Sequence, residues 1–178
     1  MKLKIKVKEL TEGCMPVINE NGDWIDLRSA VSITIPAPQS NVLKVKTING
    51  ERKSYRDVEI PTYYIPLGVA MQLPKGFEAI VASRSSGPKK LGLFIPNGQS
   101  VIDNSYNGND DQWNYVCSPL RKTTIEKGDR ICQFRIQLSQ KATLWQKIKW
   151  LLSSGVKLVR VDDLGNNNRG GFGSTGTN

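Results

Sequence analysis

The sequence contains no histidine, which removes the most common general base and the most common ligand of transition metals. Any acid–base chemistry must therefore come from a carboxylate, a lysine, a tyrosine or a cysteine. Cysteine is also scarce: Cys14, Cys117 and Cys132 match neither a zinc site nor a disulfide framework. Reduced thiols are the simplest interpretation, and we expect a cytoplasmic protein.

Long apolar runs are missing as well. The first residues alternate lysine with apolar side chains, which argues against a signal peptide, and no stretch reaches the length of a membrane span. Acidic residues are fewer than basic ones, 16 against 25, and the formal net charge is +9. This excess suits an anionic partner such as nucleic acid, a membrane surface or a phosphorylated small molecule, without choosing among them.

Many short runs of β-forming residues, separated by turn residues, predict an all-β fold. Positions 2–8 alternate strictly, which is the pattern of a half-buried strand. Further strands are expected over residues 31–35, 113–117, 130–138 and 156–161, with two more within 63–81. This spacing favours a single β-barrel or β-sandwich. We assign residues 1–164 to that domain and residues 165–178 to a glycine-rich C-terminal arm, which we expect to be flexible until something binds it.

Two segments stand apart from this pattern. Residues 42–60 carry two β-rich runs around Asn49-Gly50, a strong hairpin signal, and several basic side chains. This hairpin could clamp a nucleic acid or be a solvated ribbon. The one expected helix covers residues 144–152 and begins with a capping box of Thr143 and Gln146.

The apolar residues of this helix share one stripe, which consists of Leu144, Trp145, Ile148, Leu151 and Leu152. Trp150 lies on the opposite face. It could mark a partner site, or it could be incidentally exposed or locally packed.

The best candidate for a reacting group lies within residues 97–106. Two β-branched residues run into Asp103, and a turn-forming Asn104-Ser105 pair then leads to Tyr106. This order predicts a strand, a tight turn and a returning strand, with Asp103 at the lip of the hairpin. A carboxylate there can serve as a general base, or it can simply begin a turn.

Two polar stretches offer groups that bind phosphate. Residues 84–87, Arg-Ser-Ser-Gly, supply a guanidinium, two hydroxyls and backbone N–H groups. The arm supplies Arg169, Ser174 and Thr175, together with Phe172, which could stack on a base. A phosphate-rich ligand with a planar base fits this set, although each stretch alone could be an ordinary loop or a disordered tail.

The sequence as a whole resembles the trimeric dUTPase family. The family's motifs appear in order as Asp-Leu-Arg-Ser-Ala at 26–30, Arg-Ser-Ser at 84–86, Val-Ile-Asp at 101–103 with Tyr106 and Gly108, Gly-Asp-Arg-Ile-Cys-Gln at 128–133, and Gly-Gly-Phe-Gly-Ser-Thr-Gly at 170–176. The sequence around residues 23–28 and 127–136 is most similar to dUTPases of Gram-positive bacteria and their phages.

This resemblance implies a hydrolase of nucleotide metabolism that converts dUTP to dUMP and diphosphate and keeps uracil out of DNA. Asp103 would deprotonate the attacking water. Mg²⁺ would be held by triphosphate oxygens and waters with no direct protein ligand, and Asp26 would lie near the metal's waters. The implied fold is a jelly roll with one short inserted helix, and three chains would form a homotrimer with shared active sites.

The resemblance also implies a set of substrate-binding residues. They are Arg84, Ser85, Ser86, Asn97, Val101, Ile102, Tyr106, Gln133, Arg169, Phe172, Gly173, Ser174 and Thr175. Arginines, hydroxyls and Gln133 would hold phosphate oxygens. Asn97 and the backbone of the Asp103 segment would read uracil, Tyr106 would exclude a 2′-hydroxyl, and Phe172 would close over the base when the arm orders.

Several features depart from the family pattern. Ser100 replaces a usual glycine, Arg169 lies closer to Phe172 than usual, and Asp110 and Asp111 have no role that the family supplies. The segments 42–60 and 143–155 look like insertions that could bind a regulatory protein.

Two other functions therefore stay open beside dUTP hydrolysis. One is a regulatory binding module built on the same fold, and the other is a relative of dCTP deaminase. The glycine-rich arm argues against the deaminase, and neither a membrane partner nor a specific nucleic acid is expected.

Overall fold

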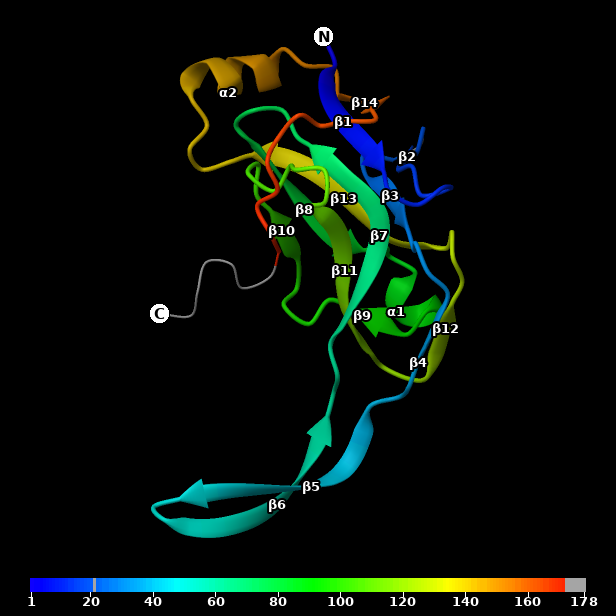
Figure 1. Ribbon diagram of the computed structural model, residues 1–178, viewed down its shortest axis with the longest axis vertical. Helices are drawn as coiled ribbons and strands as arrows, with labels where there is room; N and C mark the ends of the chain where they lie inside the picture. Colours follow the sequence, from blue (N-terminus) through cyan, green and yellow to red (C-terminus); the bar gives the residue numbers. More distant parts are fainter. Residues whose placement is uncertain (21, 172–178) are drawn as a thin grey trace.

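The computed structural model describes residues 1–20 and 22–171, and its strands form two five-stranded sheets that face each other (Figure 1). The first sheet has the order β14 (Val156–Arg160), β1 (Leu3–Glu9), β7 (Tyr63–Gln72), β11 (Gln112–Pro119) and β9 (Leu93–Phe94). The second has the order β10 (Ser100–Ile102), β8 (Phe77–Ser83), β13 (Arg130–Leu138), β3 (Ile25–Arg28) and β2 (Val17–Ile18). A small pair, β4 (Ile33–Ile35) and β12 (Thr123–Ile125), closes one end.

The core lies between the two sheets, because inward side chains of both are buried. Trp113 of β11 and Phe134 of β13 are both fully buried, and their rings meet edge to face with centroids 5.2 Å apart. This geometry suits the quadrupoles of aromatic rings. The alternation expected for the first strand is confirmed, since Leu3, Ile5 and Val7 are buried while the lysines between them are exposed. The all-β, jelly-roll-like prediction is therefore confirmed.

The predicted hairpin is confirmed as β5 (Gln39–Ile48) and β6 (Glu51–Glu59), which pair with each other and with no other described strand. Asn49 and Gly50 both have positive φ, 51° and 83°, as a two-residue turn of this kind requires. The hairpin extends away from the two sheets as a separate ribbon (Figure 1). Its strands are almost entirely exposed.

The predicted helix is confirmed as α2 (Leu144–Leu151), and both hydrogen bonds of the Thr143–Gln146 capping box are present. The helix presents Trp150 to the protein body, where its ring lies 5.3 Å from that of Phe77. Trp150 is therefore packed locally on one side, while 37% of the residue stays exposed. The apolar stripe faces outward, with Trp145 78% and Leu151 82% exposed.

A second, shorter helix was not predicted. α1 (Gly87–Lys90) lies in the segment that the sequence suggested was only a polar loop. Neither helix of the described chain has the length and apolarity needed to cross a membrane.

Candidate active site

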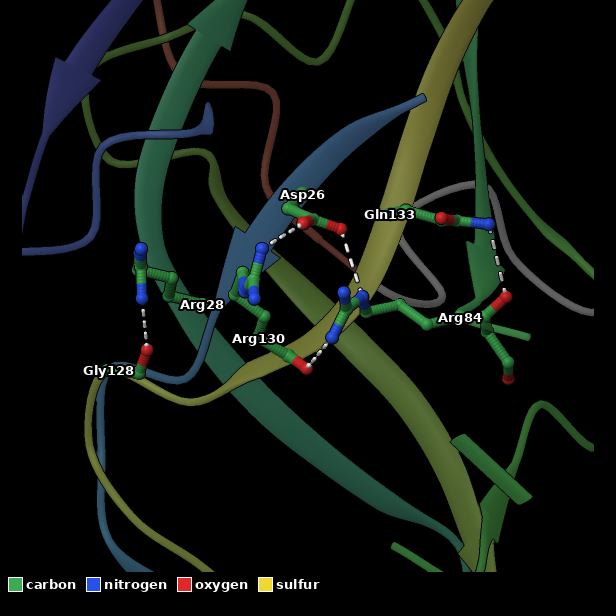
Figure 2. A network of polar contacts seen from close by, with 7 residues as sticks. Asp26, Arg28, Arg84, Gly128, Arg130 and Gln133 are labelled. Carbon is green, nitrogen blue, oxygen red and sulfur yellow. Dashed lines mark hydrogen bonds and ion pairs between the residues drawn. The ribbon is translucent and has the colours of Figure 1, made fainter. Parts of the chain in front are cut away.

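Asp26 is the centre of a polar cluster on the second sheet (Figure 2). Its side chain is only 6% exposed, and its two carboxylate oxygens meet two arginines: Arg84 Nε at 3.0 Å and Arg130 Nη1 at 3.1 Å. Strand pairing builds this arrangement, because Asp26 of β3 lies opposite Gln133 of β13, which lies opposite Ala82 near the end of β8. We call Asp26, Arg84 and Arg130 the Asp26 cluster.

A buried carboxylate next to two arginines holds both guanidinium groups in fixed orientations. Arg84 also donates to the Arg130 carbonyl oxygen at 3.4 Å, and a guanidinium has five N–H donors in all. Apart from these contacts, no partner of the Arg84 guanidinium is found among the described residues. The cluster can therefore present cationic donors to an anion without rearranging.

A pocket of about 250 Å³ adjoins this cluster. Three cations and one carboxylate are among the residues that line it: Arg84, Lys90, Arg130 and Asp129. Ser86 also lines the pocket, and Gly87 begins helix α1 there. Ser85, which stands between Arg84 and Ser86 in the sequence, is exposed. Gln133 is half-buried, and its side-chain amide donates a hydrogen bond to the Ser83 carbonyl at 3.4 Å. The structure thus brings four of the predicted phosphate-binding residues, Arg84, Ser85, Ser86 and Gln133, to one end of the second sheet.

Asp103 lies elsewhere, and the predicted hairpin around it is wrong. β10 pairs with β8 in the second sheet, whereas the next strand, β11, belongs to the first sheet. The chain makes a turn after Ile102, closed by a hydrogen bond from the Tyr106 N–H to the Asp103 carbonyl at 3.1 Å, and then crosses between the sheets. The turn residues were predicted correctly. The pairing of strands depends on long-range packing, which a local sequence pattern cannot reveal.

This turn is held firmly although Asp103 itself is exposed. Asn104 donates to the carbonyls of Pro74 at 2.7 Å and Phe77 at 2.9 Å, and the Tyr106 hydroxyl donates to the Gln112 carbonyl at 2.9 Å. Burial, with a smaller contribution from the Asp111 carboxylate, raises the pKa of Tyr106. Asp103 therefore projects from a fixed turn into a pocket of about 530 Å³ that the beginning of α2 also lines.

The other predicted residues of this segment surround the turn. Asn97 and Val101 are exposed, Val101 by 52%, and Ile102 is half-buried against the core. The Oγ atom of Ser100 is buried and has no hydrogen-bond partner among the described residues. The usual glycine would leave no such group, so this departure from the family pattern costs some hydrogen-bonding energy here.

Arg169 joins Asp103, as its Nη1 lies 2.9 Å from Asp103 Oδ2. The backbone N–H groups of Arg169 and of Gly170 are both held by Asp111 of loop 107–111. We call Asp103, Arg169 and Asp111 the Asp103 cluster. Phe172, Gly173, Ser174 and Thr175 lie outside the described residues, so their predicted roles stay predictions.

The two clusters lie at opposite ends of the same strand. Ile102 pairs with Ala79 at one end of β8, while Arg84 follows its other end. The five residue steps from Ala79 to Arg84 correspond to about 16 Å of extended chain. Asp26 is further displaced, because β8 and β13 lie between its strand and β10. Within one copy of the chain, Asp103 therefore does not face the pocket beside the Asp26 cluster.

The carboxylates near the Asp26 cluster bear on where a metal ion could bind. In residues 1–20 and 22–171 no three cysteine, aspartate or glutamate side chains gather as a metal site. Both oxygens of Asp26 are already paired with arginines, so a bond from Asp26 to a metal would compete with those contacts. The expectation that Asp26 lies near the waters of a bound Mg²⁺ stays a prediction.

Sequence reasoning assigned no role to three residues that make long-range contacts in the two clusters and the loop beside them. Arg130 stands within a recognised motif, but its ion pair with Asp26 joins positions 104 residues apart. Asp110 and Asp111 contact residues 168–170, which are 58 or 59 positions away. The only available signal was the unexplained acidic pair itself.

Comparisons with known proteins identify relatives of this chain. The sequence model of the dUTPase family matches residues 53–149. The SPbeta prophage-derived deoxyuridine 5′-triphosphate nucleotidohydrolase of Bacillus subtilis strain 168 is 40% identical over 177 residues, covering 99% of both chains.

Solved structures show the same fold. The dUTPase of Streptococcus mutans superposes with a TM-score of 0.56 at 21% identity, covering 74% of this chain and 91% of that one. A point mutant of the dUTPase of phage phi11 of S. aureus, described with a structural Mg(II) ion, gives 0.58 at 18% identity, covering 79% and 94%. On the family match and the full-length similarity to the prophage enzyme, this chain belongs to the dUTPase family.

Proposed function

We propose that the protein hydrolyses dUTP to dUMP and diphosphate, in active sites that are assembled from different copies of the chain. Family membership supports the reaction. The assembly rests on one observation: Asp103 and Arg84 lie at opposite ends of β8, and Arg84 is paired with Asp26 on the side of β8 away from β10. A homotrimer with shared sites overcomes this separation, because another copy can supply Asp103.

In this mechanism the Asp26 cluster binds and Asp103 reacts. Arg84 and Arg130 hold phosphate oxygens, helped by Ser85, Ser86 and Gln133, and Asp26 keeps the two guanidinium groups in place. Fixed cationic donors also stabilise the charge that develops on the departing diphosphate. Bound with the triphosphate, Mg²⁺ would neutralise phosphate charge and strengthen this effect.

Asp103 removes one proton from a water molecule as the water oxygen bonds to the α-phosphorus. The bond from the α-phosphorus to the bridging oxygen breaks, and the electron pair leaves with diphosphate. Arg169 contacts only Asp103 Oδ2 in this structure, so the other carboxylate oxygen can accept the proton. The negatively charged triphosphate offers Arg169 an alternative partner.

Specificity would come from the turn that carries Asp103. Asn97 and the backbone of Val101 and Ile102 would read the uracil edge. The Tyr106 ring, fixed by its hydroxyl contact with Gln112, would pack under the deoxyribose. Phe172, which lies outside the described residues, would cover the base.

The test is diphosphate release from dUTP, dCTP, dTTP and UTP, measured side by side with and without Mg²⁺. We expect rapid release from dUTP alone and a strong dependence on the metal. Ammonia release from dCTP would instead identify a deaminase. Intact dUTP in the presence of Mg²⁺ would refute the proposal.

A regulatory protein partner is a second candidate function, and the inserted segments favour it. The β5–β6 hairpin exposes Leu43, Val45 and Val58, each by more than half of its surface. The apolar stripe of α2 is exposed as well. Removal of residues 42–60 should leave dUTP turnover unchanged if the hairpin serves a partner, whereas a large loss of turnover would assign it to the enzyme.

A further inference from the structure

Asp111 is buried where the C-terminal arm begins. Only 1% of the residue is exposed, and its carboxylate accepts hydrogen bonds from three backbone N–H groups. The Gly108 N–H donates to Oδ2 at 2.8 Å, the Arg169 N–H lies 3.0 Å from both oxygens, and the Gly170 N–H donates to Oδ1 at 3.2 Å. Hydrogen bonds to an ionised carboxylate are stronger than neutral ones, so this contact holds the arm by its main chain.

Neighbouring residues of the same loop reinforce this contact. Asn168 donates to Asp110 Oδ2 at 2.6 Å and accepts from the Asp110 N–H at 2.9 Å. Asn109 accepts from the Leu164 N–H at 3.0 Å. Loop 107–111 therefore forms a continuous binding surface for the segment that leads into the arm.

Gly108 shows how closely the two segments approach. A Cβ atom at this position would lie 2.5 Å from the Cα and 2.7 Å from the backbone nitrogen of Asn168. Contacts that short are not tolerated between a side chain and rigid backbone. A glycine is therefore required here for the arm to dock, and the reason is steric.

The consequence concerns Arg169, the residue between these backbone contacts. Asp111 fixes its main chain, while its side chain reaches Asp103 at 2.9 Å. The guanidinium can therefore exchange Asp103 for a phosphate group while the main-chain contact stays in place.

We propose that Asp111 is a positioning residue of the enzyme, which pins the start of the arm to loop 107–111 so that Arg169 is delivered to the reacting groups. This inference rests on the proposed function for its kinetic consequence, but the docking itself can be measured without substrate. Asp111 does not touch the reacting atoms and acts through Arg169.

The test is Asp111→Asn, which keeps the size of the side chain but removes the charge and places an N–H₂ group among N–H donors. Asp162→Asn is the matched control, because Asp162 is an exposed carboxylate in the segment before the arm. The first readout is trypsin cleavage after Arg169 in the nucleotide-free protein, and the second is kcat and KM for dUTP.

We expect Asp111→Asn to accelerate cleavage after Arg169 by about tenfold or more, because proteolysis follows the population of the undocked state. We also expect kcat to fall about tenfold to a hundredfold, with a smaller change in KM, as for a misplaced catalytic group. Asp162→Asn should match the parent protein in both readouts. Unchanged cleavage and unchanged kcat in a folded Asp111→Asn protein would overturn the inference.

Gly108→Ala provides a second route if Asp111→Asn fails to fold. It undocks the arm by steric conflict and leaves the carboxylate intact, so it should reproduce both effects. Cleavage and kcat like those of the parent would overturn the inference by this route. If the parent protein itself does not hydrolyse dUTP, the proposed function fails, but the cleavage results still decide whether Asp111 docks the arm.

Discussion

The Asp26 cluster and the Asp103 cluster are both built from aspartate and arginine, yet we propose different roles for them. In the Asp26 cluster the carboxylate is buried, its side chain 6% exposed, and strands β3, β8 and β13 fix its position. In the Asp103 cluster the carboxylate of Asp103 is 58% exposed and stands on a turn beside Arg169. In the proposed mechanism a buried aspartate organises the arginines that bind phosphate, whereas an exposed aspartate is available to accept a proton.

The largest effect should come from Asp103→Asn, which removes the base but keeps the shape of the turn. General-base catalysis contributes about 10²- to 10⁴-fold, so kcat for dUTP should fall by that factor. Nucleotide binding should persist, because Arg84 and Arg130, which we propose bind phosphate, belong to the other cluster. Single-turnover kinetics and equilibrium binding of dUTP measure the two quantities, and turnover close to that of the parent would remove Asp103 from the mechanism.

A smaller loss of activity, accompanied by a loss of stability, is expected for Asp26→Asn. This change leaves Arg84 and Arg130 without their buried counter-ion, and the free energy of unfolding should fall by about 1–3 kcal/mol. The value of kcat/KM should fall as well, since the arginines lose their fixed orientation. Urea denaturation and steady-state kinetics test both effects.

Asp57→Asn is the matched control for the Asp26 change. The Lys44–Asp57 pair on the β5–β6 hairpin spans 3.2 Å but is solvent-exposed. Surface ion pairs contribute little, so neither stability nor turnover should change measurably. A loss of stability equal to that of Asp26→Asn would contradict the distinction between buried and exposed pairs.

Substitutions on the two faces of α2, which lines the Asp103 pocket, should differ moderately in their effect on stability and should not affect activity. Trp150→Ala removes the aromatic contact with Phe77, and such contacts contribute about 0.5–1.5 kcal/mol beyond the area they bury. Leu151→Ala, at a side chain that is 82% exposed, should stay within about 0.5 kcal/mol of the parent. If thermal unfolding shows the reverse order, the helix is attached by its apolar stripe.

The smallest expected effect concerns the reactivity of Cys132, a buried thiol beside the Asp26 cluster. Burial raises the pKa of Cys132 well above its ordinary value, and raises that of Cys117 to about 12. A thiol reagent should therefore react slowly with the native protein at pH 8 and with all three cysteines after denaturation. Asp26→Asn should accelerate labelling of Cys132, and Asp103→Asn should not.

The same pKa shifts set the direction of a pH effect on stability. The folded protein holds these thiol protons more tightly than the unfolded chain, so the stabilisation is complete below the ordinary thiol pKa of about 8.5. It decreases as the pH rises from there toward the folded-state value. Urea midpoints at pH 7.5 and pH 10 should show lower stability at the higher pH, and a higher midpoint at pH 10 would contradict this assignment.

Local patterns predicted local structure well. The alternation in β1, the Asn49-Gly50 turn and the Thr143–Gln146 capping box each depend on residues close in sequence, and each is present. The Asp103 turn was predicted, but its hairpin was wrong because β10 pairs with β8 rather than β11. The outward face of the α2 stripe could not be predicted, because periodicity identifies a stripe but not the surface that meets it.

The site shows the same limit. Motif resemblance identified Arg84, Asp103 and Arg169, but no local pattern could show that the first lies apart from the other two. The role of Asp111 depends on N–H groups 58 and 59 residues away. These relations follow from sheet order and chain crossing, which belong to the folded molecule.

The most direct test of shared active sites combines two inactive variants. Asp103→Asn and Arg84→Ala chains, each inactive alone, are unfolded together, refolded in equal amounts and assayed for diphosphate release from dUTP. If sites draw Asp103 and Arg84 from different chains, random assembly restores about a quarter of the sites. If mixed assemblies form and the mixture stays as inactive as its components, each site lies within one chain and our account is contradicted.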